Sequence, residues 1–359
     1  MSRSRLAYAK MDPAHLFDGL FVPMKGAKRE FCSDGKLRRP RLLVGMRDFG
    51  GIQIGFQGFE QLGADDQSIL LAITAQMGTE GILIPQKPKA VGSQTMALWD
   101  SLDLEVNNNT TPIGVKQTTL RSLLIDAGYN PDSSTDKIKD SLNRLANAQI
   151  REKAAGWDRR ANLISVVFKD SGETYVSTNP RLTKAIFDGQ HVKISLFERN
   201  QLTSEVSKIL HAWLCSNIRQ GQSLGNGNGA KIDTFLPHIW GRSVFDDDRR
   251  RVSNKRAQLR DALAEIDSEL KSLHMGYGWV IDQTSNGLVR ISRPKDLPMI
   301  ESGETGYSAP SEVQAAQDAD AERNWWNSGY RQGSYFQMYD VKQPKDYTVR
   351  KCPPKAQKP

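Results

Sequence analysis

Apolar and polar positions along the chain follow two patterns that recur in the same order. Residues 42–44 and 52–56 alternate with the period of short strands, and apolar residues at helical spacing then predict helices beginning near 65, 119 and 136. A strand, a turn and a second strand follow over residues 163–177. Helices followed by a β-hairpin are the order of a winged helix, so this stretch predicts a first winged-helix domain.

The second copy of the pattern marks its helices and its hairpin more clearly than the first. A helix is predicted over Ser204–Gln220, and the Gly/Asn-rich stretch 221–229 separates it from a short helix capped by Asp233. A long helix opens at Asp246 and runs to about residue 273. The hairpin behind it carries Asn286-Gly287, the dipeptide that type I′ turns favour.

These patterns divide the chain into four parts and predict an α+β fold with two tandem winged-helix domains. A basic N-terminal arm spans residues 1–40, and the first winged-helix domain, for dimerisation or DNA contact, spans 41–200. The second domain, expected to make the main DNA contacts, spans 201–295. After Pro294 the chain loses periodicity, and residues 296–324 are rich in small and acidic residues, which predicts disorder. An aromatic patch and a basic, Pro-rich end follow, so 296–359 is predicted to be a flexible tail. The role of Trp325 and Trp326 in this tail stays open.

Composition narrows the class of protein. The chain has 359 residues, 38% of them hydrophobic, and no window approaches the ~18–20 apolar residues that a spanning helix needs. The three cysteines are far apart, which disfavours a disulfide framework and a zinc site. With no secretory signal visible, we expect a cytoplasmic protein and no membrane partner.

The net charge of +8 is unevenly distributed. The excess is +5 over residues 1–60, +3 over 131–202 and +4 over 203–295, whereas 61–130 and 296–359 are net acidic. A modest excess is weak evidence for nucleic acid by itself, because many basic proteins bind none. The arrangement of the basic residues therefore matters more than their number.

The long second-copy helix arranges its basic residues on one side. At about 100° per residue, Val252, Leu259, Leu263 and Ile266 form a narrow apolar stripe, and arginines lie beside it. Arginine pairs well with guanine and asparagine with adenine in the major groove. The candidate DNA contacts on this helix are Arg249, Arg250, Ser253, Asn254, Arg256 and Arg260. A solvated amphipathic helix stabilised by Asp246–Asp248 is the alternative.

The hairpin and the first copy supply weaker candidates. If the hairpin is a wing that contacts phosphate or the minor groove, we expect its DNA contacts to come from Asn286, Arg290, Arg293 and Lys295. In the first copy the candidates are Lys137, Lys139, Asn143, Arg144, Arg159 and Arg160, the last two in a basic loop. Asp136 and Asp140 dilute that charge, so DNA contact and dimerisation stay equally open for the first domain.

Motifs for catalysis are missing. No P-loop sequence occurs, and the histidines (His15, His191, His211, His238 and His274) form no H-x-H or H-E-x-x-H pair. Paired aspartates at 65–66 and 246–248 stand where helices begin, which favours capping over a two-metal site. We therefore expect no enzyme activity, no cofactor and no metal, and a structural role for His211.

Several short strings, in conserved order over residues 12–295, carry a resemblance. They are Asp12-Pro-Ala-His15, Leu62-Gly-Ala-Asp-Asp66, Gly189-Gln-His-Val-Lys-Ile-Ser195, Ser204-Glu205, Leu210-His211, Leu214-Cys215, Lys231-Ile-Asp-Thr234, Ile239-Trp240, Gly278-Trp279 and Ile291-Ser-Arg-Pro-Lys295. In these the chain resembles the IncQ-type plasmid replication initiators of the RepC family. It is more distantly similar to iteron-binding Rep initiators with tandem winged-helix domains. The Gly/Asn insert near 221–229 and the longer tail depart from the family.

The resemblance implies a bacterial, plasmid-associated initiator. Such a protein binds repeated iterons in double-stranded origin DNA, promotes opening of an adjacent AT-rich segment and recruits a replicative helicase, plasmid- or host-encoded. It also implies a homodimer formed through the first winged-helix domain. A winged-helix transcriptional repressor would share every residue pattern above and is the alternative. A nickase or primase lacks its metal and nucleotide motifs here.

Overall fold

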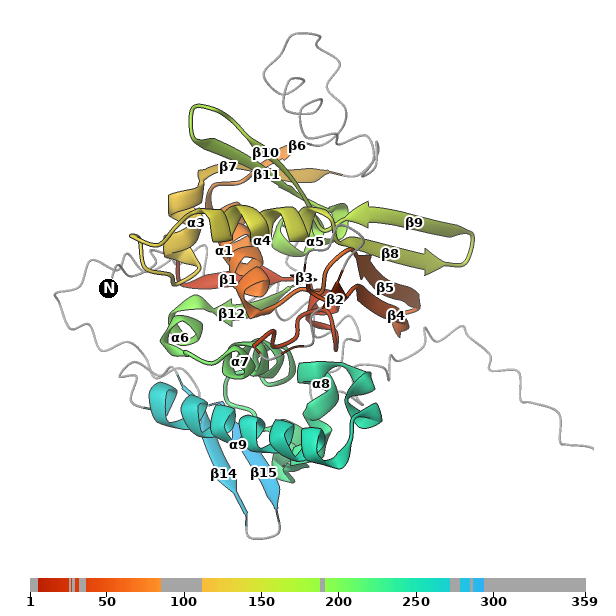
Figure 1. Ribbon diagram of the computed structural model, residues 1–359, viewed down its shortest axis with the longest axis vertical. Helices are drawn as coiled ribbons and strands as arrows, with labels where there is room; N and C mark the ends of the chain where they lie inside the picture. The colour runs from red at the N-terminus through yellow and green to blue at the C-terminus, as the bar shows by residue number, and fades with distance from the viewer. Residues whose placement is uncertain are drawn as a thin grey trace, which may run out of the picture.

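The computed structural model describes residues 6–25, 27, 30–31, 37–84, 112–187, 191–271, 278–284 and 287–293 (Figure 1). The fold is mixed α+β, with helices packed against small antiparallel sheets, as the sequence predicts. The predicted disordered tail, residues 296–359, lies outside the described residues. Every helix within them is too short or too polar to cross a bilayer.

The first half is organised around one central helix, α1 (Ala64–Glu80). It is buried from Asp66 to Met77 because strands and helices of both halves pack around it. Gly63 precedes the helix and donates its N–H to the Asp66 carboxylate, so Asp66 caps α1 from its first turn. Further elements of this half follow α1 along the chain: β6 (Ile82–Ile84), β7 (Ile113–Thr119), α3 (Leu120–Asp126), α4 (Asp136–Ala146), β10 (Ile164–Phe168), β11 (Glu173–Thr178) and α5 (Pro180–Phe187).

The second half repeats this order on a smaller scale. Its elements are α7 (Glu205–Asn217), β13 (Ala230–Lys231), α8 (Leu236–Trp240), α9 (Arg249–Lys271), β14 (Val280–Gln283) and β15 (Leu288–Ser292). Short 3-10 turns complete it: η3 (Leu224–Gly227), η4 (Ile232–Thr234) and η5 (Arg242–Asp246). Asp248 begins α9 by accepting the N–H of Arg251, which confirms the predicted acidic start of this helix.

The two halves share a sheet topology. In each, a strand between the first and second helices pairs with the last strand of the terminal hairpin: β7 with β11, and β13 with β15. The strand orders are β10-β11-β7-β6 and β14-β15-β13. The helices and hairpins lie in the predicted order, and the pairing strands β7 and β13 are additions that sequence periodicity did not predict.

A second sheet distinguishes the first half. Its strands are β4 (Leu42–Phe49), β5 (Ile52–Gly58), β8 (Gln149–Ala154) and β9 (Trp157–Asn162), paired in that order. The expected basic loop around Arg159 and Arg160 is therefore strand β9, a correction. Charged residues on both faces hide the period of two in β8 and β9, and Gly156, with φ of 87°, makes their tight turn.

Within residues 1–40, expected as a basic arm, the described stretch 6–25 contributes to the core. Strand β1 (Tyr8–Met11) pairs with β12 (Val192–Ser195), and the 3-10 turn η1 (Pro13–Leu16) is buried behind it. Met11, Leu20 and Phe21 of this segment are at most 3% exposed, and Leu16 and Phe17 are at most 9% exposed. Two small strands, β2 (Glu30–Phe31) and β3 (Leu37–Arg38), pair with each other farther along.

The buried carboxylate of Asp18 joins the two halves. One oxygen lies 2.8 Å from the Arg47 guanidinium on β4, and the other lies 2.6 Å from Nδ1 of His238 on α8. The His238 ring in turn stacks on Trp213 of α7, with ring centroids 4.4 Å apart. Arg47, His238 and Trp213 belong to three different elements, so this carboxylate helps to fix the contact between the halves.

Asp18→Ala would remove the carboxylate that pairs with both Arg47 and the buried His238. Breaking a buried charged pair costs roughly 3–5 kcal/mol, so we expect the free energy of unfolding, measured by urea titration, to fall by about 3 kcal/mol. Asp48→Ala, which removes an exposed carboxylate from β4, is the control and should change it by less than ~0.5 kcal/mol. Equal losses in the two variants would contradict this role for Asp18.

Candidate nucleic-acid interface

Helix α9 has one buried and one exposed face. Leu259, Leu263, Ile266 and Leu270 are fully buried against α7 and the β14–β15 hairpin, and Val252 is half-buried at the end of the stripe. This confirms the predicted apolar stripe. The orientation of the helix leaves its opposite face to solvent along the N-terminal half.

The exposed face carries polar side chains that are not engaged by other parts of the described protein. Among the described residues, Arg249, Arg250, Ser253, Asn254 and Arg260 are exposed, and no side-chain hydrogen bond or ion pair within 4 Å engages them. Ala257 and Ala264 are exposed on the same face, and their small side chains allow a ligand to approach the helix backbone closely. This face is free to donate hydrogen bonds to a ligand.

Arg256, predicted to contact DNA, is paired with a carboxylate in this structure. Its Nε and a terminal nitrogen lie 2.6 and 2.8 Å from the two carboxylate oxygens of Asp233. The guanidinium holds the pKa of Asp233 below its usual value. Asp233 therefore ties η4 to α9, and it does not cap α8 as expected from the sequence. Lys255 is likewise paired, with Asp247 at 2.5 Å.

The hairpin candidates divide in the same way. Arg290 on β15 is exposed, whereas Arg293 is 7% exposed and its guanidinium lies 5.1 Å from the Trp279 ring centroid. Arg293 is therefore a buried support of the hairpin in this structure and does not reach the outer surface. Asn286 and Lys295 lie outside the described residues.

In the first half, α4 presents Lys137, Lys139 and Asn143 to solvent. Arg144, on the same helix, points inward and donates to Asp66 at 2.8 and 3.0 Å. The second oxygen of Asp66 accepts from Arg39 at 2.7 Å, so this buried carboxylate joins α1, α4 and the N-terminal segment. Beyond α4, Arg160 is exposed and Arg159 is paired with Glu152 at 2.7 Å.

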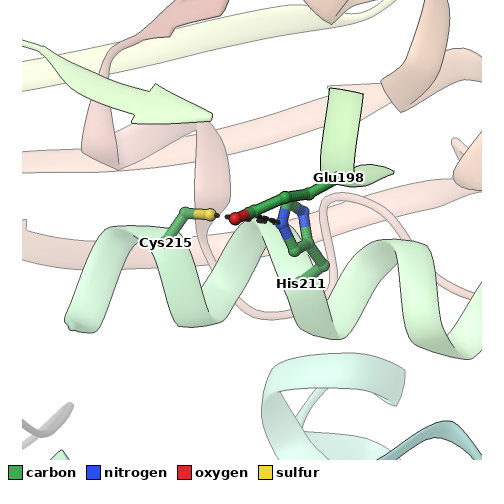
Figure 2. A group of neighbouring side chains, drawn as sticks. All are labelled: Glu198, His211 and Cys215. Carbon is green, nitrogen blue, oxygen red and sulfur yellow. Dashed lines mark hydrogen bonds and ion pairs between the residues drawn. The ribbon is translucent and has the colours of Figure 1, made fainter. Parts of the chain in front are cut away.

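A buried polar cluster lies where the second half meets the connecting helix α6 (Leu196–Gln201), and Figure 2 shows its centre. Glu198 of α6 lies 2.7 Å from Nε2 of His211, and this nitrogen lies 3.6 Å from the Cys215 sulfur. Trp279 donates its indole N–H to the same carboxylate at 3.4 Å, and Arg293 lies 3.8 Å from it. The cluster therefore anchors the base of the β14–β15 hairpin to α6 and α7.

The donor atoms of Glu198, His211 and Cys215 lie within 4.8 Å of one another, close enough to consider a metal. A ligating histidine normally donates its second ring N–H to an acceptor, but Nδ1 of His211 has no partner among the described residues. N–H donors also converge on Glu198. These features favour a hydrogen-bonded junction. The sequence placed His211 as structural but gave no signal for Glu198, whose partners are distant in the chain.

The ionisation of this junction has a defined direction. Burial opposes protonation of His211, but the Cys215 sulfur and the Glu198 carboxylate outweigh burial and raise the pKa of His211 to about 9. Burial raises the pKa of Glu198, yet its bonds to His211 and the charge of Arg293 leave it below the usual value. A protonated imidazole therefore faces a carboxylate at neutral pH.

This predicts a loss of stability at alkaline pH. In the unfolded chain His211 loses its proton near pH 6.5, whereas the folded chain retains it to about pH 9. The free energy of unfolding should therefore fall as pH rises through this window, by at most about 3 kcal/mol at ~1.4 kcal/mol per pKa unit. Urea titrations at both limits test this, and His211→Gln should remove the decline. A decline of the same size in the variant would assign it to another group.

Comparison with known proteins adds one finding to this geometry. A family model described as replication protein C (RepC) matches residues 3–295, which spans both halves and every described element. A search of curated proteins finds no match. The match covers more than half of the chain, and it includes α9, the β14–β15 hairpin and the buried N-terminal segment. The chain therefore belongs to the RepC family of plasmid replication proteins.

Proposed function

We propose that this protein is a non-enzymatic plasmid replication initiator that binds repeated iterons in double-stranded origin DNA. In this proposal each half is a winged helix, with α9 as the main DNA-contacting helix and β14–β15 as its wing. The observation that carries the proposal is the exposed face of α9, where Arg249, Arg250 and Asn254 stand free of protein partners.

The chemistry of this face suits base edges in the major groove. Arginine can donate two hydrogen bonds to guanine, and asparagine can pair with adenine in the same bidentate manner. The nearby alanines impose no bulk between the helix backbone and the bases. Arg256, held by Asp233, and Arg290 on the wing would contact phosphates, which position a protein without specifying sequence.

The first half supports two roles. Helices α4 and α9 both lie on the side of the molecule nearest the viewer in Figure 1. Lys137, Lys139 and Asn143 are exposed on α4, and in this proposal they contact the same duplex as α9. In the first half, the sheet with the strand order β10-β11-β7-β6 has β10 and β6 at its two edges, and the outer edges of these strands have no strand partner among the described residues. Unpaired edges favour association, so the same half would supply the proposed homodimer.

The further steps of the proposal follow the family resemblance. They are opening of an AT-rich segment beside the iterons and recruitment of a replicative helicase, plasmid- or host-encoded, in the bacterial cytoplasm. The described residues hold no nucleotide-binding loop, so the chain would supply binding energy to the origin and leave unwinding to the helicase.

Arg250→Ala tests the assignment of the exposed face. If Arg250 contacts a base, the affinity for the cognate origin should fall by the ~1–3 kcal/mol of one bidentate pair, with little change for unrelated DNA. Arg251→Ala removes the same charge from another side of the helix, where Arg251 lies near Asp247 and Asp248. It should reduce both affinities slightly. Titration of both variants at two salt concentrations separates the effects.

Permanganate reactivity of thymines on a supercoiled origin plasmid tests the initiator role. We expect protein-dependent reactivity in an AT-rich segment beside a footprint whose repeats are spaced by near-integral helical turns. A footprint without thymine reactivity would instead support the repressor alternative. Mg²⁺-dependent nicking of the same plasmid would contradict the assignment as a non-enzyme.

A further inference from the structure

The β8–β9 hairpin is an addition to the repeated order of elements. In the second half the chain passes from α9 to the terminal hairpin, whereas in the first half β8 and β9 lie between α4 and β10. The pair continues the sheet of β4 and β5 and projects from the body beyond them (Figure 1). Since β7, β10 and β11 already form the sheet shared by both halves, the projecting end is not needed to close the core.

An exposed tryptophan stands at the tip of this hairpin. Ala154 pairs with Trp157 across the turn, and Trp157 is 40% exposed. The guanidinium of Arg159 lies 5.1 Å from the indole ring centroid and supports one side of the ring. The exposed part of the indole is open to solvent, where another planar ring can stack on it.

A chain of ion pairs holds Arg159 beneath the indole. Nε of Arg159 lies 2.7 Å from one oxygen of the buried Glu152, and a terminal nitrogen of Arg181 lies 3.2 Å from the other. Arg181 also lies 2.8 Å from the Asp12 carboxylate. This chain reaches the core of the first half, so the orientation of Trp157 is set before any ligand arrives. Preorganisation of this kind reduces the entropy cost of binding.

The opposite face of the hairpin is cationic. Side chains alternate between faces along a strand, so Arg151, Lys153 and Arg160 lie on the face opposite Trp157. Arg151 is paired with Asp158 at 2.5 Å, but Lys153 and Arg160 are exposed and make no ion pair with a described residue. The hairpin thus offers an aromatic ring on one side and positive charge on the other.

We propose that this hairpin binds unpaired DNA, with Trp157 stacking on a base and with Lys153 and Arg160 contacting phosphates. The inference rests on the proposed function, since it places the hairpin at the opened segment of the origin. Bases in a closed duplex are already stacked on their neighbours, whereas an unpaired base exposes the ring face that an aromatic side chain needs. The combination of stacking and unspecific positive charge fits single-stranded DNA of any sequence.

The test uses the full chain and two probes of identical sequence flanking one origin repeat: a duplex with a preformed unpaired bubble and the same duplex fully paired. Loss of one base–aromatic stack corresponds to ~5- to 150-fold in affinity. We expect Trp157→Ala to lose about that factor on the bubble probe and less than about twofold on the paired probe. Trp157→Phe should retain most of the bubble affinity, because it keeps an aromatic ring.

Phe168→Ala is the matched control, since Phe168 is a 38% exposed aromatic at the end of β10, a strand of the other four-stranded sheet. It should leave both affinities unchanged. The double variant Lys153→Ala, Arg160→Ala should weaken bubble binding and reduce its salt dependence. Unaltered bubble affinity in Trp157→Ala would overturn the inference, as would equal losses on both probes, which would make the hairpin a duplex contact.

The experiment distinguishes failure of the hairpin inference from failure of the proposed function. A wild-type chain that binds the paired probe with no preference for the bubble would reject the hairpin inference alone. A wild-type chain that binds neither probe would reject the proposed function first. Urea titration of each variant establishes that it is folded, and the exposed positions of Trp157, Lys153 and Arg160 make a folding defect an unexpected result.

Discussion

The arrangement of this molecule depends on carboxylates that are buried and paired between elements far apart in the chain. Asp18 joins β4 to α8, Asp66 joins α1 to α4 and the N-terminal segment, and Glu198 joins α6 to α7 and the base of the terminal hairpin. Apolar contacts alone would allow neighbouring elements to slide, because dispersion has little directional preference. A buried charged group needs its specific partners, and the loss of one partner destabilises the fold by more than the intact pair contributes. These carboxylates therefore set the relative position of the elements.

The same constraint divides the arginines into two groups. Arg144, Arg256 and Arg293 are held by acidic or aromatic partners and support the fold, while Arg249, Arg250 and Arg160 extend into solvent. The net charge of +8 counts both groups equally. The charge that a ligand meets is therefore more local than the total, and among the described residues it includes exposed side chains of α4, α9 and the β8–β9 hairpin.

Sequence periodicity predicted the features that depend on residues close together in the chain, and it missed those that depend on partners distant in sequence. The apolar stripe of α9 and the acidic start of that helix were predictable because both depend on residues within one helix. The roles of Arg293 and Arg144 were not, since their partners, Glu198 and Asp66, are distant in sequence. Strand β9 was missed because the cross-strand pair Arg151–Asp158 places charge where a simple alternation expects polar and apolar positions. The burial of residues 8–24 could not be predicted either, because β1 pairs with β12, a strand more than 180 residues later in the chain.

The pairing of β1 with β12 has a consequence for the order in which the protein is made. Tyr8 cannot find Ser195 until the entire first half has left the ribosome, so the first residues synthesised wait longest for their strand partner. The Asp18 contact with His238 extends that wait into the second half. A nascent chain thus carries its first strand unpaired through most of translation, and an incomplete chain lacks the contacts that close its core. Truncated products of this protein would be poorly folded and open to proteolysis, so only chains made through the second half would accumulate.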